Sequence, residues 1–551
     1  MRGAKILLTF ELKNLDCDVL VMGGGLAGIM AALAAKETQS RIFLFMKGAI
    51  GSSGSSSYAG GGFAASVGDK DTPGLHAGDT LAGGYGLNDA KLVEVFCQKA
   101  PEAMMCLKQL GVSLGSADGR LSLLDVPGHS VKRGIRCLGG GTQKMMQVLR
   151  HHVIERKIKV FEDIPIIDLV VEQGRVLGAV GINTRNPCLY HIKTAAIVIA
   201  SGGMGNLYPL TSNPGDLWGD GYVLGLLNGA TLKDMEFIQF SPTALAHPSN
   251  LQGTSTGGML LGEGALLTNR NGERFMERYD PARMEASTRD VVSRAIQREI
   301  VEGRGTKHGG VYLDLSTLTR EFLEKNAGHF MALLAKNGID PLTSLLEIAP
   351  AVHFCMGGIK INASCETGID GMFAAGEVTA GVHGANRLSS NGLTEALVFG
   401  RIAGEQAGRR AVERSASQTD FFGWERYLES SNSAEFLTIE QIKTMVTQVR
   451  QCMLKAGGLE RNRANLEDGI KRLKQLRKKI EQLRPKNPST LVEYVRLRNM
   501  AILGLTILTS ALVREESRGA HFRSDFPNRN DVKWLRNIEL SWENGELTTN
   551  C

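Results

Sequence analysis

Three glycines at fixed spacing, Gly23, Gly25 and Gly28, form the motif G-x-G-x-x-G, in which Leu26 and Ala27 fill the last two variable positions. A strand-type run precedes the motif and a helix-type run follows it, at residues 17–22 and 29–34. At such a turn the first glycine makes the bend, the second lets the backbone approach a pyrophosphate, and the third lets helix and strand pack closely. The motif therefore predicts a dinucleotide site, although a glycine-rich turn without a nucleotide also fits it.

The next strand-type run, residues 41–46, lacks the acid that the dinucleotide fold usually carries at its end. It ends at Met46, and Lys47 and Gly48 follow. That acid normally accepts hydrogen bonds from the adenosine ribose. Either other groups hold the ribose, or the ligand is not the usual one.

Composition limits the remaining possibilities. Glycine supplies 66 of the 551 residues, well above the usual share of about 7%. We therefore expect many loops in which the backbone closely approaches another group. A net charge of +6 is small for this length and gives no general argument for nucleic-acid binding. The nine cysteines are odd in number and form no CxxC pair. We expect no disulfide framework, no protein-bound iron–sulfur cluster, no metal site, and a reducing, cytoplasmic location.

No segment has the features of a membrane span or a signal peptide. The longest apolar stretch, residues 501–513, contains Gly504 and is too short to cross a bilayer. Near the N-terminus, Glu11 and Lys13 interrupt a few apolar residues, and no small-residue cleavage site follows. We expect a protein without a direct membrane span.

The order of strand-type and helix-type runs predicts an α/β fold with an insertion. Residues 16–240 alternate between the two types, which indicates a parallel sheet covered by helices. The pattern changes after residue 240, and a strand-turn signal returns at residues 371–377. We expect four segments: 1–240, the first part of a nucleotide-binding domain; 241–345, an inserted domain; 346–420, the second part; and 421–551, a helical domain.

The last segment contains a basic helix with one apolar stripe, formed by Leu473, Leu476, Ile480 and Leu483. Such a stripe usually packs into a helical bundle and leaves its charged face in solvent. The alternative is a docking surface for a partner.

Eleven ordered motifs together resemble the succinate dehydrogenase/fumarate reductase flavoprotein family, which includes L-aspartate oxidase. They are GGGLAGIMAA, SSGSSSYAGGGFAAS, HAGDTLAGG, GHSVKRG, IASGGMG, DGYVLG, DMEFIQFSPTAL, TRDVVSRAI, AVHFCMGGIKI, GMFAAGEVTAGVHGANRLSSNGLTEALVFGRIAG and ESRGAHFRSDFP. The resemblance implies bound FAD and a Rossmann-like FAD-binding domain interrupted by a capping α+β domain, with a C-terminal helical domain. The glycine turn would then hold the FAD pyrophosphate. The similar oxidases also end the second strand without an acid and continue with Lys-Gly.

The resemblance also implies which residues contact FAD. Glycine-rich backbone would approach the cofactor, Glu377 would accept from ribityl hydroxyls, and Ser390, Asn391 and Leu393 would lie along the isoalloxazine ring. Ser55 stands where members with covalent FAD have a histidine, so we expect non-covalent FAD and a poorer fit to succinate oxidation. The full set is Gly23, Gly25, Leu26, Ala27, Gly28, Lys47, Gly48, Ser55, Ser56, Gly61, Gly62, Gly202, Gly203, Asp220, Glu377, Ser390, Asn391 and Leu393.

By the same resemblance, three residues carry the chemistry. Arg289 stands at the position of the proton donor and acceptor, and Arg387 with His353 would hold a substrate carboxylate. An arginine acts as an acid only when it is buried near other cations and served by a relay, whereas a guanidinium suits a bidentate carboxylate. Without the family context, Arg387 also fits a salt-bridge residue and His353 a core histidine.

Departures from the family pattern surround this site. Ser241 replaces a substrate-polarising histidine, Gly258 replaces the relay glutamate, and Leu261 replaces the relay arginine, while Glu263 is kept. We infer that the site is not tuned for fumarate.

Three functions remain open. The leading one is an FAD-dependent oxidoreductase acting on a small carboxylate, either L-aspartate-oxidase-like or a dicarboxylate or enoate reductase. The second is a flavoprotein subunit that passes electrons to a separate iron–sulfur protein, and the third is a non-enzymatic flavin-binding scaffold.

Overall fold

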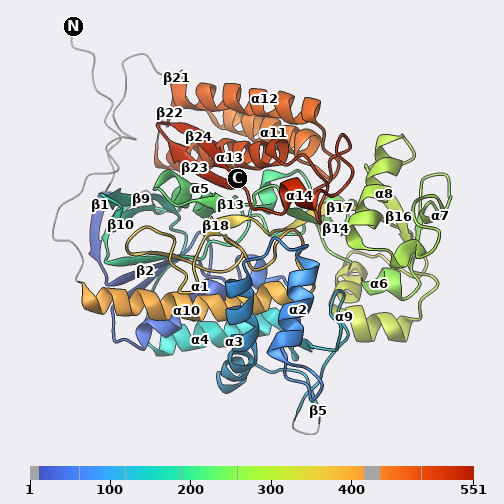
Figure 1. Cartoon of the computed structure of the whole chain (residues 1–551), viewed down its shortest axis with the longest axis horizontal. Coiled ribbons are helices and arrows are strands. Elements are labelled where there is room, and N and C mark those ends of the chain that lie inside the picture. Colours follow the sequence, from blue (N-terminus) through green and yellow to red (C-terminus); the bar gives the residue numbers. More distant parts are fainter. Residues whose placement is uncertain are drawn as a thin grey trace.

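The computed structural model describes residues 11–60, 62–117, 120–186, 188–256, 259–414, 435–485 and 487–551. Figure 1 shows three parts: a sheet with helices below it, which we call the main domain, a helical layer above it, which we call the C-terminal domain, and a smaller capping unit at the right.

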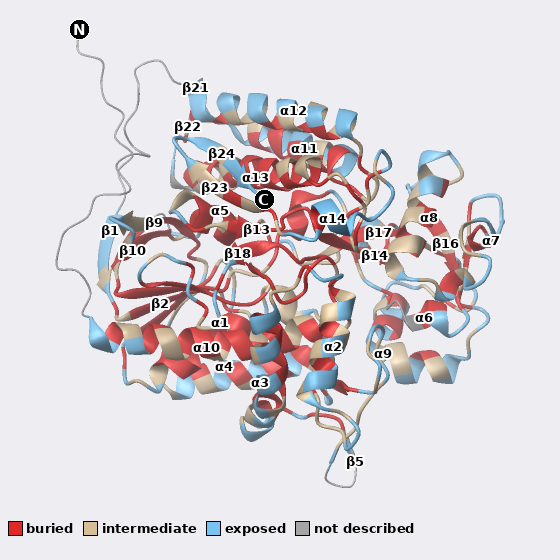
Figure 2. Cartoon of the chain, in the orientation of Figure 1, coloured by how far each residue is buried: buried red, intermediate tan, exposed pale blue. Residues whose placement is uncertain are grey.

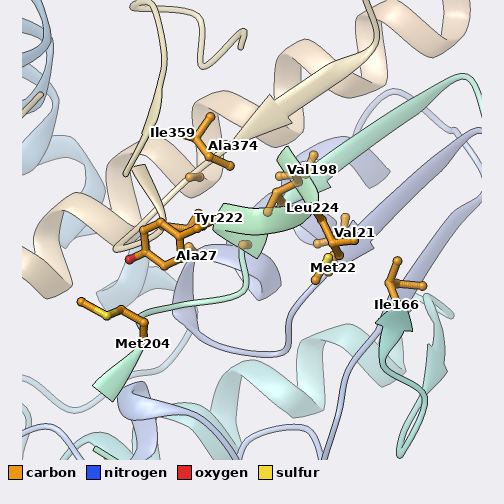
Figure 3. Packing of buried hydrophobic residues seen from close by; sticks show 14 of the residues in the cluster. Val21, Met22, Ala27, Ile166, Val198, Met204, Tyr222, Leu224, Ile359 and Ala374 are labelled. Atoms are coloured by element: carbon orange, nitrogen blue, oxygen red, sulfur yellow. The ribbon is translucent and has the colours of Figure 1, made fainter. Parts of the chain in front are cut away.

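The main domain is built on a five-stranded parallel sheet with the order β19-β12-β2-β3-β8. The strands span Val19–Met22 (β2), Ile42–Phe45 (β3), Lys159–Phe161 (β8), Ala196–Ile199 (β12) and Met372–Ala374 (β19). The chain leaves this sheet after β12 and returns to it at β19, so the predicted interrupted domain is confirmed. In Figure 3, Val21 of β2 and Val198 of β12 lie beside Leu224 in one buried cluster.

Helices α1 (Leu26–Lys36) and α10 (Asn391–Glu413) pack tightly together beside this sheet. A Cβ atom at Gly400 would lie 2.5 Å from the carbonyl oxygen of Ala27, and one at Gly404 would lie 2.1 Å from that of Ala31. The close approach therefore requires glycine at both positions. The other helices of the domain are α2 (Pro73–Gly83), α3 (Ala90–Gln109), α4 (Gly141–Glu155) and α5 (Asp220–Leu227).

Two further sheets complete the main domain. One has the order β1-β11-β10-β9, with strands Glu11–Asp16, Cys188–Lys193, Arg175–Ile182 and Ile166–Glu172. The other has the order β20-β18-β13-β23-β24, with strands Thr379–Ala380, Gly358–Lys360, Leu232–Lys233, Glu539–Glu543 and Glu546–Asn550. Because β23 pairs with β13, the C-terminal end of the chain is fixed to the main domain. Short pairings join β4 (Gly62–Ala64) to β7 (Gly134–Arg136), β5 (Ser116–Ala117) to β6 (Arg120–Leu121), and β21 (Glu435–Phe436) to β22 (Leu483–Arg484).

The capping unit has its own sheet and its own core. The antiparallel sheet has the order β14-β17-β16-β15, with strands Ile238–Leu245, Leu346–Cys355, Val311–Asp314 and Leu266–Thr268. Helices α6 (Met259–Gly262), α7 (Met276–Tyr279), α8 (Arg289–Val301) and α9 (Arg320–Lys336) surround it. Its buried cluster runs from Leu245 to Ile348 and is separate from the main core. Figure 2 shows buried segments on both sides of the junction with the main domain, where β14 and β17 connect the two.

The C-terminal domain consists of α11 (Ile439–Ala456), α12 (Arg463–Gln482), α13 (Pro488–Val513) and the short α14 (Asp531–Trp534). On α12, Leu473 and Ile480 are buried, whereas Lys474 and Lys478 are exposed, so the apolar stripe packs into the bundle. Within the described ranges, Ser489–Val513 is the one stretch long and apolar enough to cross a membrane, and 78% of its apolar window is buried in the protein. The apolar stretch at residues 501–513 is the second half of this longer helix.

Candidate active site

The glycine turn after β2 leaves an open surface at the N-terminus of α1. A Cβ atom at Gly23, where φ is 119°, would lie 2.2 Å from the Ala200 carbonyl oxygen, and one at Gly28 would lie 1.8 Å from the Gly23 carbonyl oxygen. A Cβ atom at Gly25 would meet only Ser56 Oγ, at 3.4 Å. The N-cap residue of α1 is Gly25, which has no side chain to cap the helix. Gly23 and Gly28 thus serve packing, and Gly25 leaves room for a phosphate at the positive end of the helix.

A turn of serines, Ser55–Ser57, lies beside this helix terminus. The Leu26 amide donates a hydrogen bond of 3.0 Å to Ser56 Oγ. Ser55 Oγ is buried and has no hydrogen-bond partner among the described residues. A buried hydroxyl without a partner is costly, so a polar group of a ligand is expected beside it. Ser55 and Ser56 therefore fit contacts to the part of FAD that joins the pyrophosphate to the flavin ring.

Lys47, which follows β3, takes part in a network with two aspartates. Its Nζ atom donates to the Asp216 carbonyl oxygen at 2.5 Å and to Asp220 Oδ2 at 2.7 Å. The Asp216 carboxylate accepts from the Gly54 amide at 3.0 Å, and its Oδ1 atom is buried without a partner in the described ranges. Asp216 is therefore a candidate cofactor contact that sequence reasoning missed. Its position depends on an approach between segments about 170 residues apart, and no local motif indicates it.

Gly203 follows β12, and Glu377, which follows the neighbouring strand β19, packs directly against it. A Cβ atom at Gly203 would lie 2.1 Å from Glu377 Oε1, which accepts from the Cys355 amide at 3.2 Å. Burial raises the pKa of Glu377 from 4.5 to about 7. Gly202, with φ of 72°, continues the same turn.

The start of α10 meets β4 at the predicted flavin contact. A Cβ atom at Gly62 would lie 2.6 Å from the Oγ atom of Ser390, which has φ of 67° and precedes the helix. Leu393 is partly exposed on the first turn. The Asn391 side chain instead bonds to His76 Nε2 at 3.0 Å and to Thr80 Oγ1 at 3.1 Å, so it secures the helix start. Of the predicted set, Gly61 lies outside the described residues.

Arg387 is a buried cation whose hydrogen-bond acceptors are neutral. One terminal NH2 group donates to Gln239 Oε1 at 2.9 Å, and the guanidinium carbon lies 4.6 Å from the centre of the Phe354 ring. Its Nε atom is buried and finds no partner within the part of the chain that is described. Burial, and then the charge of Arg289, lower the pKa of Arg387 to about 10.

His353 and Arg289 complete a cluster around Arg387. The Nδ1 atom of His353 lies 2.8 Å from Ser212 Oγ. Burial, then Arg387 and Arg289, hold the pKa of His353 well below its usual value, so the imidazole is neutral near pH 7. Arg289 is the first residue of α8, and burial lowers its pKa with no offset from a described carboxylate. Glu377 and Glu395 are near enough to Arg387 to raise its pKa in part, but neither arginine forms an ion pair with a carboxylate among the described residues. The two cations are therefore a candidate anion site.

Two of the positions that depart from the family pattern, Ser241 and Leu261, lie in the capping unit. Ser241 is buried on β14, and the nearby Thr243 Oγ1 is buried without a partner among the described residues. Leu261 belongs to the apolar core of the capping unit, and Glu263 is exposed. Gly258 lies outside the described residues. The apolar burial of Leu261 shows that this side chain has become part of the core.

Comparisons with known proteins agree with this geometry. Residues 18–393 match the family model described as FAD binding domain, and residues 446–549 match the model described as fumarate reductase flavoprotein C-term. The chain is 37% identical to one subunit of the fumarate reductase (CoM/CoB) of Methanothermobacter marburgensis, over 96% of this chain and 98% of that one. It is 33% identical to an L-aspartate oxidase of Agrobacterium fabrum, over 95% and 94% of the two chains.

A solved structure of a variant of E. coli quinol fumarate reductase matches with a TM-score of 0.89 and 30% identity, covering 98% of this chain and 96% of that chain. This match extends through the main domain, the capping unit and the C-terminal domain. The chain therefore belongs to the succinate dehydrogenase/fumarate reductase flavoprotein family, which includes L-aspartate oxidase, and it is an FAD-dependent oxidoreductase.

Proposed function

We propose that the chain transfers hydride between its flavin and a small carboxylate-bearing substrate held between Arg387 and Arg289. The observation that carries this proposal is the buried Arg387, whose Nε atom has no partner among the described residues and whose nearby groups include a second cation and a neutral imidazole. A substrate carboxylate supplies the missing negative charge and the missing acceptor.

Each residue of the cluster has a distinct task. Bound FAD supplies the two-electron hydride chemistry. Arg387 binds and orients the carboxylate, and the neutral His353 donates one N–H to the substrate without adding a third charge. Arg289 begins α8 of the capping unit. It is the candidate proton donor or acceptor, because it stands at the position that has this role in the family. Ser241 contributes a hydroxyl on the same side.

The substrate class includes both an L-aspartate-type oxidation and a fumarate-type reduction, because the two substrates share the carboxylates that Arg387 and Arg289 recognise. Relatives of both kinds match nearly the whole chain. The altered positions Ser241, Gly258 and Leu261 support a substrate other than fumarate itself.

The test is an anaerobic titration of the flavin absorbance with dicarboxylates, amino acids and enoates, for the protein as purified and for the reduced protein. At least one carboxylate should bleach or reoxidise the flavin, and Arg387→Ala should abolish that response while FAD stays bound. Arg472→Ala is the matched control, because Arg472 pairs with Asp468 on the exposed side of α12. A full response in Arg387→Ala contradicts the proposed anion site.

A second candidate function, that of a flavoprotein subunit in a larger enzyme, is supported by the name of one relative. The Methanothermobacter marburgensis protein is named as one subunit of its enzyme, and this chain likewise fits a flavoprotein subunit that exchanges electrons with a separate iron–sulfur protein. Purification of the tagged chain from its own cells distinguishes the two. An iron-containing partner at equal stoichiometry supports the subunit, whereas oxygen consumption by the isolated chain with substrate supports a self-sufficient oxidase.

A further inference from the structure

The two arginines of the anion site belong to different parts of the protein. Arg387 precedes α10 of the main domain, and Arg289 begins α8 of the capping unit. The capping unit has a separate core and is connected to the main domain through β14 and β17. Units joined in this way move relative to each other unless further contacts hold them. The distance between the two arginines therefore depends on what fixes α8.

One face of α8 contacts the C-terminal domain at two points. The guanidinium carbon of Arg294 lies 4.9 Å from the centre of the Phe522 ring, and Arg298 Nε donates to Glu460 Oε1 at 2.8 Å. Arg294 and Arg298 are four residues apart, so they lie on the same face of the helix. We call Glu460 and Phe522 the C-terminal clamp.

The two clamp residues lie far apart in the chain, but Arg461 links the segments that carry them. The Arg461 amide donates to the Phe522 carbonyl oxygen at 3.1 Å. The Arg461 guanidinium is fully buried and donates to the Glu236 carbonyl oxygen at 2.7 Å and to His521 Nδ1 at 2.8 Å. Glu460 and Phe522 therefore keep a constant relation to each other and to the base of β14.

The segment that carries Phe522 also contacts the loop that carries Arg387. The Ala520 amide donates to the Ala385 carbonyl oxygen at 3.0 Å. A Cβ atom at Gly519, where φ is 53°, would lie 2.3 Å from that oxygen. Residues 519–522 thus touch the Arg387 loop on one side and α8 on the other.

We propose that Glu460 and Phe522 are positioning residues that set α8, and with it Arg289, at the correct distance from Arg387. This inference rests on the proposed function, because it assigns the two contacts to the closure of that carboxylate site. The contacts are few, and the Arg298 side chain is 46% exposed. The clamp therefore holds the closed arrangement weakly enough to open for substrate entry and product release.

The experiment compares Arg298→Glu, Glu460→Arg and the double variant Arg298→Glu/Glu460→Arg in the FAD-loaded full-length protein. Hydrogen–deuterium exchange of residues 289–301 is measured without ligand, and malonate affinity is measured by the flavin absorbance change. Each single variant should exchange faster in residues 289–301 and bind malonate about threefold to tenfold more weakly. The double variant should restore both values. Arg472→Glu, which breaks an exposed pair on α12, is the control and should change neither.

Phe522 is tested in parallel. Phe522→Leu should speed exchange in residues 289–301, and Phe522→Tyr, which keeps the ring face, should not. With the substrate found in the panel, KM should rise in the clamp variants while kcat recovers at saturation, because bound carboxylate draws the two arginines together.

Unchanged exchange in the single variants, or a double variant as defective as either single one, overturns the clamp. If the unmodified protein binds neither malonate nor any carboxylate of the panel, the proposed function fails. The exchange measurements still decide the clamp in that case, since they need no ligand.

Discussion

Gln239 and Arg387 hold each other through two hydrogen bonds: a terminal NH2 group of Arg387 donates to Gln239 Oε1 at 2.9 Å, and Gln239 Nε2 donates to the Arg387 carbonyl oxygen at 3.0 Å. The buried guanidinium is thus oriented by a neutral amide, and its positive charge remains available to a ligand. A carboxylate at position 239 would orient it equally well but would cancel that charge.

Gln239→Glu should therefore weaken carboxylate binding by about 10- to 100-fold, the value of one charged hydrogen bond, while the protein stays folded and keeps FAD. The measurement is the dissociation constant of malonate from the flavin absorbance change. Gln475→Glu makes the same chemical change at an exposed position on α12 and is the control. Unaltered affinity in Gln239→Glu would show that Arg387 does not bind the ligand.

Gly25→Val should abolish FAD retention without unfolding the protein. The β-branched side chain fills the open surface beside α1, where an added Cβ meets only Ser56 Oγ at 3.4 Å, so it displaces the pyrophosphate and no protein atom. The measurements are flavin content after purification and thermal unfolding of the FAD-free protein. Gly78→Ala is the control because an added Cβ there meets nothing within 4 Å. Stoichiometric FAD in folded Gly25→Val would refute the assignment of this turn.

These two sites differ in how far the sequence alone predicts them. The glycine turn depends on neighbours in the chain, so the motif identifies it together with the strand before and the helix after. The partnership of Gln239 with Arg387 joins residues 148 positions apart, and Asp216 reaches the cofactor site through Lys47 and Gly54. Such contacts follow from tertiary packing between segments that are far apart in the chain, which periodicity does not encode.

For Asn391, the sequence predicts the position in the fold but not the hydrogen-bond partners. The motif brings the residue to the start of α10, near Gly62, but only the structure shows that His76 and Thr80 take up its amide group. Resemblance locates a position in the fold, whereas the hydrogen-bond partners decide which part of the residue faces a ligand.

Glu377 should make the FAD-free protein less stable as pH rises. Burial raises its folded pKa from 4.5 to about 7, so between these values the folded state holds a proton that the unfolded state releases. The free energy of unfolding then falls with rising pH, by about 3 kcal/mol at most across that window. Glu377→Gln should remove this part of the pH dependence in urea unfolding curves. Parallel pH profiles for the two proteins would show that Glu377 titrates normally.

FAD should be released when the protein is denatured. Ser55 has a hydroxyl at the position where covalent attachment needs an imidazole nitrogen, and it lies in the turn beside α1. After acid precipitation the flavin absorbance should appear in the supernatant, and the pellet should be colourless. A yellow pellet that survives repeated washing would demonstrate a covalent link through another residue.

Fumarate reduction should be slow in the unmodified protein, because the relay that would serve Arg289 is missing. Leu261 lies in the apolar core of the capping unit and Glu263 is exposed, so neither carries a proton to Arg289. Loss of one positioned acid or base commonly lowers a rate by about 10²–10⁴-fold. Restoring the pattern requires all the changes together, since an arginine at position 261 without an acidic neighbour would be a buried, unpaired charge.

The measurement is steady-state fumarate reduction with a reduced dye, for the unmodified protein and for the combined variant Ser241→His/Gly258→Glu/Leu261→Arg. The combined variant should be faster, and Leu261→Met, which keeps the core apolar, should not. Rapid fumarate turnover by the unmodified protein would mean that another route delivers the proton. Thr256 Oγ1 donates a hydrogen bond to the Thr243 carbonyl oxygen at 3.1 Å, and Thr243 Oγ1 finds no partner among the described residues. These two hydroxyls are therefore the first groups to replace in that case.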